Sequence, residues 1–257
     1  MSNLRDEMKA IVLAGGFAKR MWPLTKDKPK HLLPIAGRPM LSHVLDRVTE
    51  VDAIDTIYIS TNAKFETNFK EFIKEYSASL KEGTKMKLTI EDTFSEGEKL
   101  GSIGALNFLI TSESISEDLL IIGGDNLFEF DMNGLVDFSS ERSSDAIAVY
   151  DVGSTDIAKL YGILEVDKED RIISFVEKPE EPKSTLSATA CYMLTKEGVA
   201  SIKKYIDEGN SPDAMGLFIA WLIGKRDVYA YSFEGSWFDI GGFESLEEAD
   251  NFYSEKN

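Results

Sequence analysis

The chain has 257 residues, of which 43% are hydrophobic, so it is long enough for one large domain or two small ones with a sizeable core. Its 28 Lys and Arg residues against 45 Asp and Glu residues give a formal net charge of −17. Such an acidic surface argues against binding to nucleic acid or to anionic membranes, because both attract basic faces. A single cysteine, Cys191, excludes an intramolecular disulfide and a cysteine zinc cluster.

The first half of the chain alternates between short apolar runs and helical patterns. Strands are predicted at 9–13, 54–60, 87–90 and 119–123, and helices at 40–50, 62–80 and 104–110. This order predicts a parallel sheet covered by helices, because parallel strands need crossover connections.

The second half has closer strands and shorter connections. Strands are predicted at 146–151, 162–166, 171–177, 189–194 and 228–233, and helices at 196–208, 212–224 and 243–254. Segments 111–117, 139–145 and 180–187 are predicted to be surface loops. The composition shows no linker and no internal repeat, so one mixed α/β domain is the simplest account.

The N-terminus, MSNLRDEMK, contains no hydrophobic signal region. The longest uncharged apolar run near the C-terminus, residues 214–224, is too short to span a bilayer. We therefore expect a cytoplasmic protein with no membrane partner.

The first predicted strand ends in Ala14, Gly15 and Gly16, and the cations Arg20 and Lys30 come after it. A glycine loop after a strand can bring backbone N–H groups close to phosphates. The spacing matches neither the Walker A loop nor the dinucleotide fingerprint, and a double glycine is as often a plain tight turn. The loop therefore indicates a nucleotide site only together with the residues C-terminal to it.

Residues 11–40, IVLAGGFAKRMWPLTKDKPKHLLPIAGRPM, resemble the signature LAGGxGxRLxPLTxxxPKxLLPIxGKP of the nucleotidyltransferases that join a sugar 1-phosphate to a nucleoside triphosphate. Further segments match in order: LGSIGAL at 100–106, IIGGDN at 121–126, YG at 161–162, VEKP at 176–179 and WFDIG at 237–241. The resemblance covers essentially the whole chain. It implies a Rossmann-like α/β nucleotidyltransferase domain over 1–257, with a mixed, mostly parallel central sheet flanked by helices. Its nucleotide-binding part would be about 8–125 and its sugar-phosphate-binding part about 126–257, with no further C-terminal domain.

The reaction that this resemblance implies is attack by a sugar phosphate oxygen on the α-phosphorus, with pyrophosphate leaving. Both reactants are anions, so catalysis rests on positioning and on screening of their repulsion. The resemblance assigns catalytic roles to Arg20, Lys30 and Lys178. The planar guanidinium of Arg20 suits the leaving phosphates, and Lys30 would neutralise charge near the α-phosphate.

The resemblance also implies sets of binding residues. The nucleotide-binding residues are Ala14, Gly15, Gly16, Gly101 and Asp125, and the sugar-phosphate-binding residues are Gly162, Glu177 and Lys178. Asp125 and Asp239 are expected to hold Mg²⁺ with triphosphate oxygens, since Mg²⁺ favours one or two carboxylates plus phosphates. His31 and His43 are interpreted as structural or surface residues, so no histidine metal cluster is expected.

Two departures from the signature stand out. Ala18 replaces the second glycine of the loop, so the loop is expected to sit slightly differently. Residues 91–99 are longer and more acidic than the usual run before LGSIGAL, and base selection through Glu91 is a hypothesis. The first choice of substrates is glucose 1-phosphate with dTTP or UTP.

Two alternatives stay open. One is a cytidylyltransferase for phosphocholine or a similar compound, whose pocket would favour a cationic head group. The other is an inactive regulatory subunit that binds nucleotide sugars. Such a subunit is expected to lose its functional lysines or carboxylates, whereas this chain retains Arg20, Lys30, Asp125, Lys178 and Asp239. The expected partners are a nucleoside triphosphate and a sugar 1-phosphate, and a homo-oligomer is also open.

Overall fold

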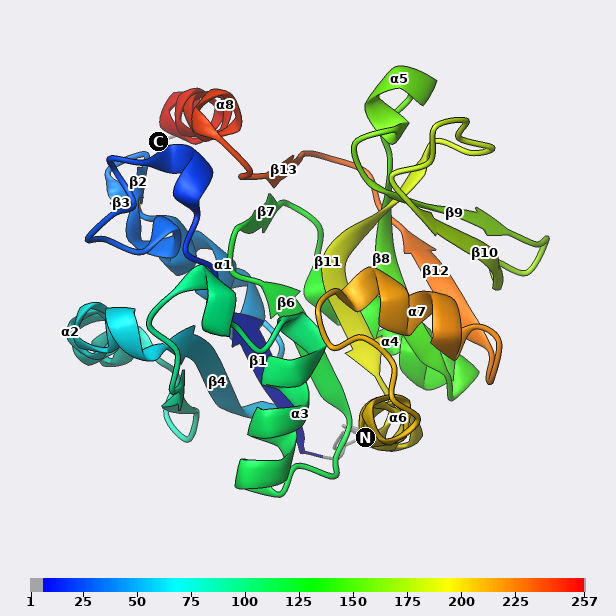
Figure 1. The fold of residues 1–257 in the computed structure, drawn as a ribbon, viewed down its shortest axis with the longest axis horizontal. Helices are drawn as coiled ribbons and strands as arrows, with labels where there is room; N and C mark the ends of the chain where they lie inside the picture. The colour runs from blue at the N-terminus through cyan, green and yellow to red at the C-terminus, as the bar shows by residue number, and fades with distance from the viewer. Residues whose placement is uncertain (1–6, 257) are drawn as a thin grey trace. The chain divides into compact units, whose positions relative to one another are not determined.

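A computed structural model of the chain describes residues 7–256. They form two compact units (Figure 1). The first comprises the described residues of Met1–Lys99 and Gly235–Asn257 together with Ile122–Met132, and the second comprises Leu100–Ile121 and Asn133–Glu234. The chain therefore passes between the units four times. The expected division at residue 125 concerns binding roles and stays a prediction.

Three parallel strands form the sheet of the first unit: β1 (Met8–Leu13), β4 (Ile54–Asn62) and β5 (Lys85–Glu91). Strand β6 (Leu119–Gly123) neighbours β1 and contributes its last two residues to this unit. The apolar side chains of Ile11 and Ile57 are fully buried, as expected for parallel strands covered on both faces. Because the strands are parallel, their carboxyl ends lie at one edge of the sheet.

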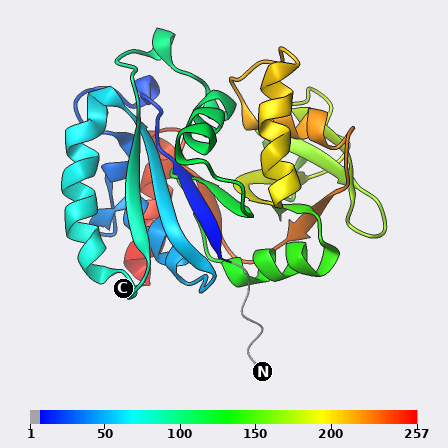
Figure 2. The same cartoon turned by 90° about the horizontal axis from the view of Figure 1, so that it is seen from below.

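Three helices cover this unit: α1 (Met40–Thr49), α2 (Glu66–Tyr76) and α8 (Phe243–Glu255). Helix α2 packs along β4 and β5 (Figure 2) and buries Phe69 completely. It is shorter than the helix predicted at 62–80, because 3-10 turns occupy both of its flanks. Two small ladders complete the unit: β2 (Pro34–Ile35) with β3 (Arg38–Pro39), and β7 (Asn126–Phe128) with β13 (Trp237–Asp239).

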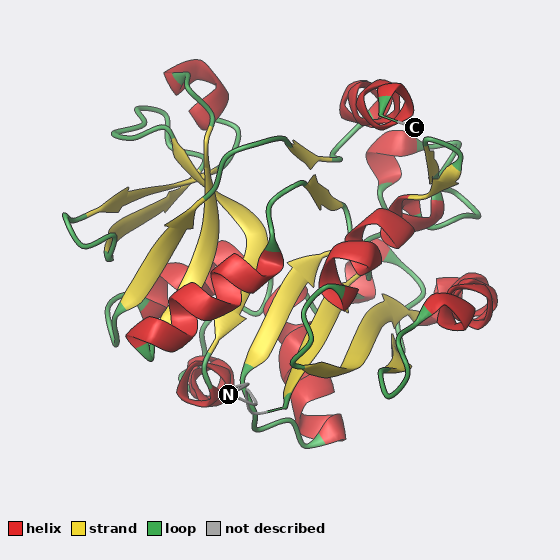
Figure 3. Cartoon of the chain, turned by 180° about the vertical axis from the view of Figure 1, so that it is seen from behind, coloured by secondary structure: helices red, strands yellow, loops and turns green. Residues whose placement is uncertain are grey.

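The second unit contains a mixed set of strands with helices packed beside them (Figure 3). Strand β8 (Asp145–Asp151) pairs parallel to β12 (Val228–Ser232) and antiparallel to β11 (Leu186–Leu194). Strand β9 (Gly162–Val166) pairs antiparallel to β10 (Ile172–Glu177). The helices of this part of the chain are α3 (Ser102–Glu113), α4 (Met132–Arg142), α5 (Thr155–Ala158), α6 (Lys196–Asp207) and α7 (Met215–Leu222).

The predicted α/β class with a mixed sheet flanked by helices is confirmed. The loop predicted at 139–145 is confirmed only at 143–144, because α4 continues to Arg142 and β8 begins at Asp145. Ser140 fits inside that helix because its hydroxyl donates to the carbonyl of Val136 at 2.8 Å. The loop predicted at 111–117 likewise begins with the last turn of α3. Among residues 7–256, no helix is long and apolar enough to cross a membrane.

A buried ion pair anchors the second unit. The Asp145 side chain is fully buried, and its Oδ1 accepts hydrogen bonds from the backbone N–H and the hydroxyl of Thr195, both at 2.8 Å. Arg226 Nε lies 2.8 Å from Asp145 Oδ2. A Cβ added at Gly198 would lie 2.2 Å from Asp145 Oδ1, so the first turn of α6 needs glycine there. Burial raises the pKa of Asp145, while Arg226 and Thr195 act to lower it.

We predict that Arg226→Met lowers the free energy of unfolding by about 2 to 3 kcal/mol, because it leaves a buried carboxylate without its counter-charge. The folded-state pKa of Asp145 already lies above its ordinary value and should rise further in the variant. A raised carboxyl pKa means that the folded state takes up a proton more readily than the unfolded state, so the deficit should shrink as the pH falls from about 8 to about 5. Urea denaturation at both pH values measures the difference in free energy of unfolding between the variant and the parent protein. Arg171→Met, which removes an exposed arginine paired with Asp167 and Asp227, is the control, and an equal loss there would contradict the prediction.

Candidate active site

Lys30 joins three segments of the first unit that are far apart in the sequence. It opens the 3-10 turn Lys30–Leu32, directly after Pro29. Its Nζ donates to Asp125 Oδ2 and to the carbonyl of Ile240, both at 2.6 Å, and its side chain is only 11% exposed. Burial acts to raise the pKa of Asp125, but the Lys30 charge and its hydrogen bond outweigh this effect and hold the pKa at about 2. Asp125 is therefore a carboxylate near neutral pH.

Asn126 connects the two aspartates that the sequence predicted as metal ligands. It lies opposite Asp239 in the β7–β13 ladder. Its Nδ2 donates to Asp125 Oδ1 at 3.1 Å and to Asp239 Oδ1 at 3.4 Å. The indole N–H of Trp237 donates to Asn126 Oδ1 at 2.8 Å. Because an indole nitrogen can only donate, this contact fixes which end of the amide faces the carboxylates.

The chemistry of this donor set fits Mg²⁺. Asp125 and Asp239 share a single amide donor and offer oxygen ligands, which Mg²⁺ prefers. Within residues 7–256, no group of three or more His, Cys, Asp and Glu side chains is arranged to hold a metal. Two carboxylates alone suit an ion whose remaining positions are filled by phosphates and water rather than by protein.

The glycine loop is tied to the end of β4. The backbone N–H of Ala14 donates to the carbonyl of Ser60 at 2.8 Å, and Asn62 Nδ2 donates to the carbonyl of Gly15 at 2.8 Å. A Cβ added at Gly15 would lie 3.0 Å from Glu91 Oε1, so glycine allows the loop to approach this carboxylate. Arg20 lies in the 3-10 turn Lys19–Met21, and its side chain is exposed.

Ala18 keeps the backbone conformation that glycine would supply. Its φ and ψ are 45° and 46°, in the left-handed region that L-residues other than Gly adopt at a cost. The buried hydroxyl of Thr25 donates to the Ala18 carbonyl at 2.8 Å and holds the turn. The departure from the signature therefore carries a local energetic cost.

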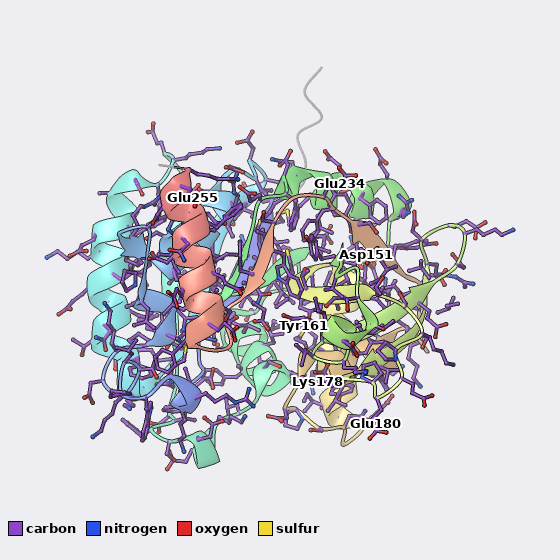
Figure 4. The ribbon with its side chains drawn as sticks, turned by 90° about the horizontal axis from the view of Figure 1, so that it is seen from above. Asp151, Tyr161, Lys178, Glu180, Glu234 and Glu255 are labelled. Carbon is purple, nitrogen blue, oxygen red and sulfur yellow. The ribbon has the colours of Figure 1, made fainter. Side chains whose placement is uncertain are left out.

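The predicted sugar-phosphate residues meet in the second unit. Gly162 lies opposite Glu177 in the β9–β10 ladder, and a Cβ added at Gly162 would lie 3.0 Å from Glu177 Oε2 and 2.5 Å from the Phe175 ring. The backbone N–H of Lys178 donates to the carbonyl of Tyr161 at 2.9 Å (Figure 4). Lys178 has φ 46°, and its Nζ lies 3.9 Å from Glu177 Oε1. Both side chains are exposed.

Gly101 also belongs to the second unit. Because it has no side chain, the backbone of Asp213 can pack closely against it. Its φ is +77°, and an added Cβ would lie 2.4 Å from the Cα of Asp213. The backbone N–H groups of Ser102 and Ile103, which begin α3, donate to the carbonyls of Asp213 and Pro212 at 2.9 and 3.0 Å. The nucleotide-binding role expected for Gly101 stays a prediction.

The structure thus groups Arg20, Lys30, Asp125 and Asp239 with the glycine loop in the first unit, and Gly101, Gly162, Glu177 and Lys178 in the second. Sequence reasoning assigned no role to Asn126 or Trp237, although both lie inside the segments IIGGDN and WFDIG. Burial lowers the pKa of His31 to about 4, so it is a neutral core residue, as expected.

Residues 9–256 match the model of the family described as Nucleotidyl transferase. The chain belongs to this family. This confirms the family membership that the motifs predicted. The magnesium requirement and the cytoplasmic location stay predictions.

The chain is 30% identical over 249 residues to the bifunctional protein GlmU of Methanocaldococcus jannaschii, covering 97% of this chain and 55% of that protein. It is 28% identical to the UTP–glucose-1-phosphate uridylyltransferase AglF of Haloferax volcanii, covering 97% and 98%. It thus spans little more than half the length of some curated relatives. Other relatives are named as adenylyl- and guanylyltransferases. The fold is shared with the UTP-bound UGPase from Acinetobacter baumannii, with a TM-score of 0.81, 20% identity and coverage of 98% and 94%.

We predict that Ala18→Gly raises the free energy of unfolding by roughly 0.5 to 1 kcal/mol, because relief of the left-handed strain exceeds the entropy cost of glycine. Urea denaturation measures the change. Ala105→Gly, a buried position inside α3, should instead lose about 1 kcal/mol or more. A loss of stability at both positions would show that the strain at Ala18 is absent in solution.

Proposed function

We propose that this chain transfers a nucleotidyl group from a nucleoside triphosphate to a sugar 1-phosphate. A phosphate oxygen of the sugar attacks the α-phosphorus, the bond to the β-phosphate oxygen breaks, and pyrophosphate leaves. The observation that carries the proposal is the network of Lys30, Asp125, Asn126 and Asp239. It joins one fixed ammonium to two carboxylates, and the backbone N–H of Gly124, next to Asp125, donates to the carbonyl of Leu13 at the start of the glycine loop. The chain belongs to the nucleotidyl transferase family.

The groups proposed for the triphosphate lie in the first unit. Lys30 is held by two acceptors, so its ammonium needs little reorganisation to face a phosphate. Arg20 is exposed and can take the leaving phosphates in a bidentate manner. Asp125 and Asp239 would hold Mg²⁺, which screens phosphate charge when bound.

The groups proposed for the sugar phosphate lie in the second unit. Lys178 would pair with the phosphate, and the neighbouring Glu177 would accept hydrogen bonds from sugar hydroxyls. The left-handed backbone at Lys178 costs about 1 to 3 kcal/mol, and such strain concentrates at functional sites. It fixes the direction in which the lysine leaves the end of β10, which supports a positioning role.

The choice of substrates is supported by the names of the relatives. The uridylyltransferase name of AglF, which this chain matches along almost its full length, supports glucose 1-phosphate as the acceptor and UTP as one donor. Other relatives are named for other bases, so these names do not decide the base, and the residues of this chain must.

A pyrophosphate-release screen tests the function. Five triphosphates (ATP, GTP, CTP, UTP and dTTP) are combined with the 1-phosphates of glucose, mannose and N-acetylglucosamine and with choline phosphate, in the presence of Mg²⁺. We expect turnover with at least one sugar 1-phosphate and its loss when EDTA is added. Turnover with choline phosphate and CTP alone would favour the cytidylyltransferase instead, and no turnover in any combination would reject the proposal.

The roles of two residues are tested in the same assay. Asp125→Ala and Lys178→Ala should each lower kcat/KM by about 100-fold or more, because each removes a charge that acts on the phosphates. Lys168→Ala, which removes an exposed lysine in the β9–β10 turn, is the control and should leave the rate unchanged. Rates within about twofold of the parent in either test variant would contradict its assigned role.

The contact between Trp237 and Asn126 generates a separate prediction. Trp237→Phe removes the donor that orients the amide, so the Mg²⁺ concentration needed for half-maximal activity should rise by about 10-fold. Trp221→Phe removes an indole that donates to Glu208 and should not change the Mg²⁺ dependence. An unchanged Mg²⁺ requirement in Trp237→Phe would show that the indole does not orient the site.

A further inference from the structure

A buried carboxylate lies against the glycine loop of the first unit and has no part in the proposed chemistry. Glu91 is the last residue of β5, and it is only 5% exposed. Its Oε1 lies 3.0 Å from the position that a Cβ on Gly15 would take, and the hydroxyl of Ser60 donates to the same oxygen at 3.3 Å. Glu91 also lies opposite Asn62, whose amide holds the Gly15 carbonyl. The loop and the carboxylate are therefore one packed arrangement.

This placement limits what Glu91 can face. A carboxylate accepts hydrogen bonds and repels anions, so it is unsuited to the triphosphate chain that Arg20 and Lys30 would bind. It suits the part of a nucleotide that carries N–H donors, which is the base. Glycine at position 15 allows the loop backbone to come this close to the carboxylate, since a larger side chain would press on Oε1.

We propose that Glu91 selects the base and that the preferred triphosphate is GTP. This rests on the function proposed above and revises the choice of dTTP or UTP made from the sequence. Guanine presents two adjacent N–H donors, on N1 and on the exocyclic 2-amino group, and these match the two oxygens of one carboxylate. Uracil and thymine present a single N–H between two carbonyl oxygens, so the second carboxylate oxygen would face an acceptor. Adenine and cytosine each present one amino group beside a ring-nitrogen acceptor, which satisfies only one of the two oxygens.

The test uses the full chain with Mg²⁺ and the sugar 1-phosphate most active in the screen. We expect kcat/KM for GTP to exceed that for UTP and dTTP by at least about 10-fold. ITP, which lacks the 2-amino group, should fall roughly 10-fold below GTP because one charge-assisted hydrogen bond is lost. Glu91→Gln should lower the GTP rate by roughly 10- to 100-fold and move the preference toward UTP and dTTP, because an amide offers one donor and one acceptor. Asp92→Asn removes the adjacent exposed carboxylate and should change none of these ratios.

Direct binding separates this proposal from the function itself. Calorimetry with GTP, ITP and UTP reports base preference even if no sugar phosphate supports turnover. If no combination turns over but GTP binds more tightly than UTP, the proposed function fails and the base assignment stands. A UTP or dTTP preference in the parent protein overturns the assignment, as does a Glu91→Gln variant with an unchanged GTP-to-UTP ratio. A variant that changes only the ratio of GTP to dGTP also overturns it, because Glu91 would then contact the ribose.

Discussion

The ammonium of Lys30 makes the contacts on which the proposed catalytic groups of the first unit depend. It is held at 2.6 Å by an oxygen of Asp125 and by the carbonyl of Ile240, and so it ties together segments separated by 95 and 210 positions in the sequence. A partly buried aspartate is costly without a counter-charge, and Lys30 supplies it. The same contact fixes the direction of Asp125, whose other oxygen accepts from Asn126. Charge balance and geometry at this site therefore come from one interaction.

This balance has an electrostatic result that suits an acidic protein. Because Asp125 offsets part of the charge of Lys30, the exposed Arg20 is proposed to supply further positive charge near the loop for an incoming anion. A chain with a net charge of −17 can bind an anion only where its cations converge locally. In the second unit the same role is proposed for Lys178 beside Glu177, and the backbone conformation rather than burial holds it in place.

Much of the fold could be predicted because long apolar runs mark buried strands. Strands β6 and β9 lie at the predicted bounds, and β1 and β8 each begin one residue earlier. The β7–β13 ladder could not be predicted, because three residues are too few to show a period and the partners are more than 100 positions apart. That ladder places Asn126 against Asp239. The hydrogen bonds of the Asn126 amide to the two aspartates therefore could not be predicted either. The charged residues of the candidate site were predicted from the family motifs, whereas a neutral amide gave no separate signal.

During translation the residues of this candidate site emerge from the ribosome in chain order. Asp239 and Ile240 are the last of them to emerge. Until then Lys30 lacks one of its two acceptors, and Asn126 lacks both the strand opposite it and the indole of Trp237. The second unit, by contrast, ends at Glu234 and has all of its strands by that point. Because domains fold as their residues become available, the unit that contains the N-terminal loop is the later of the two to complete on the ribosome. A nascent chain released before residue 235 would contain the glycine loop, Arg20 and Lys30. It would lack the contacts that Trp237, Asp239 and Ile240 make with this part of the first unit.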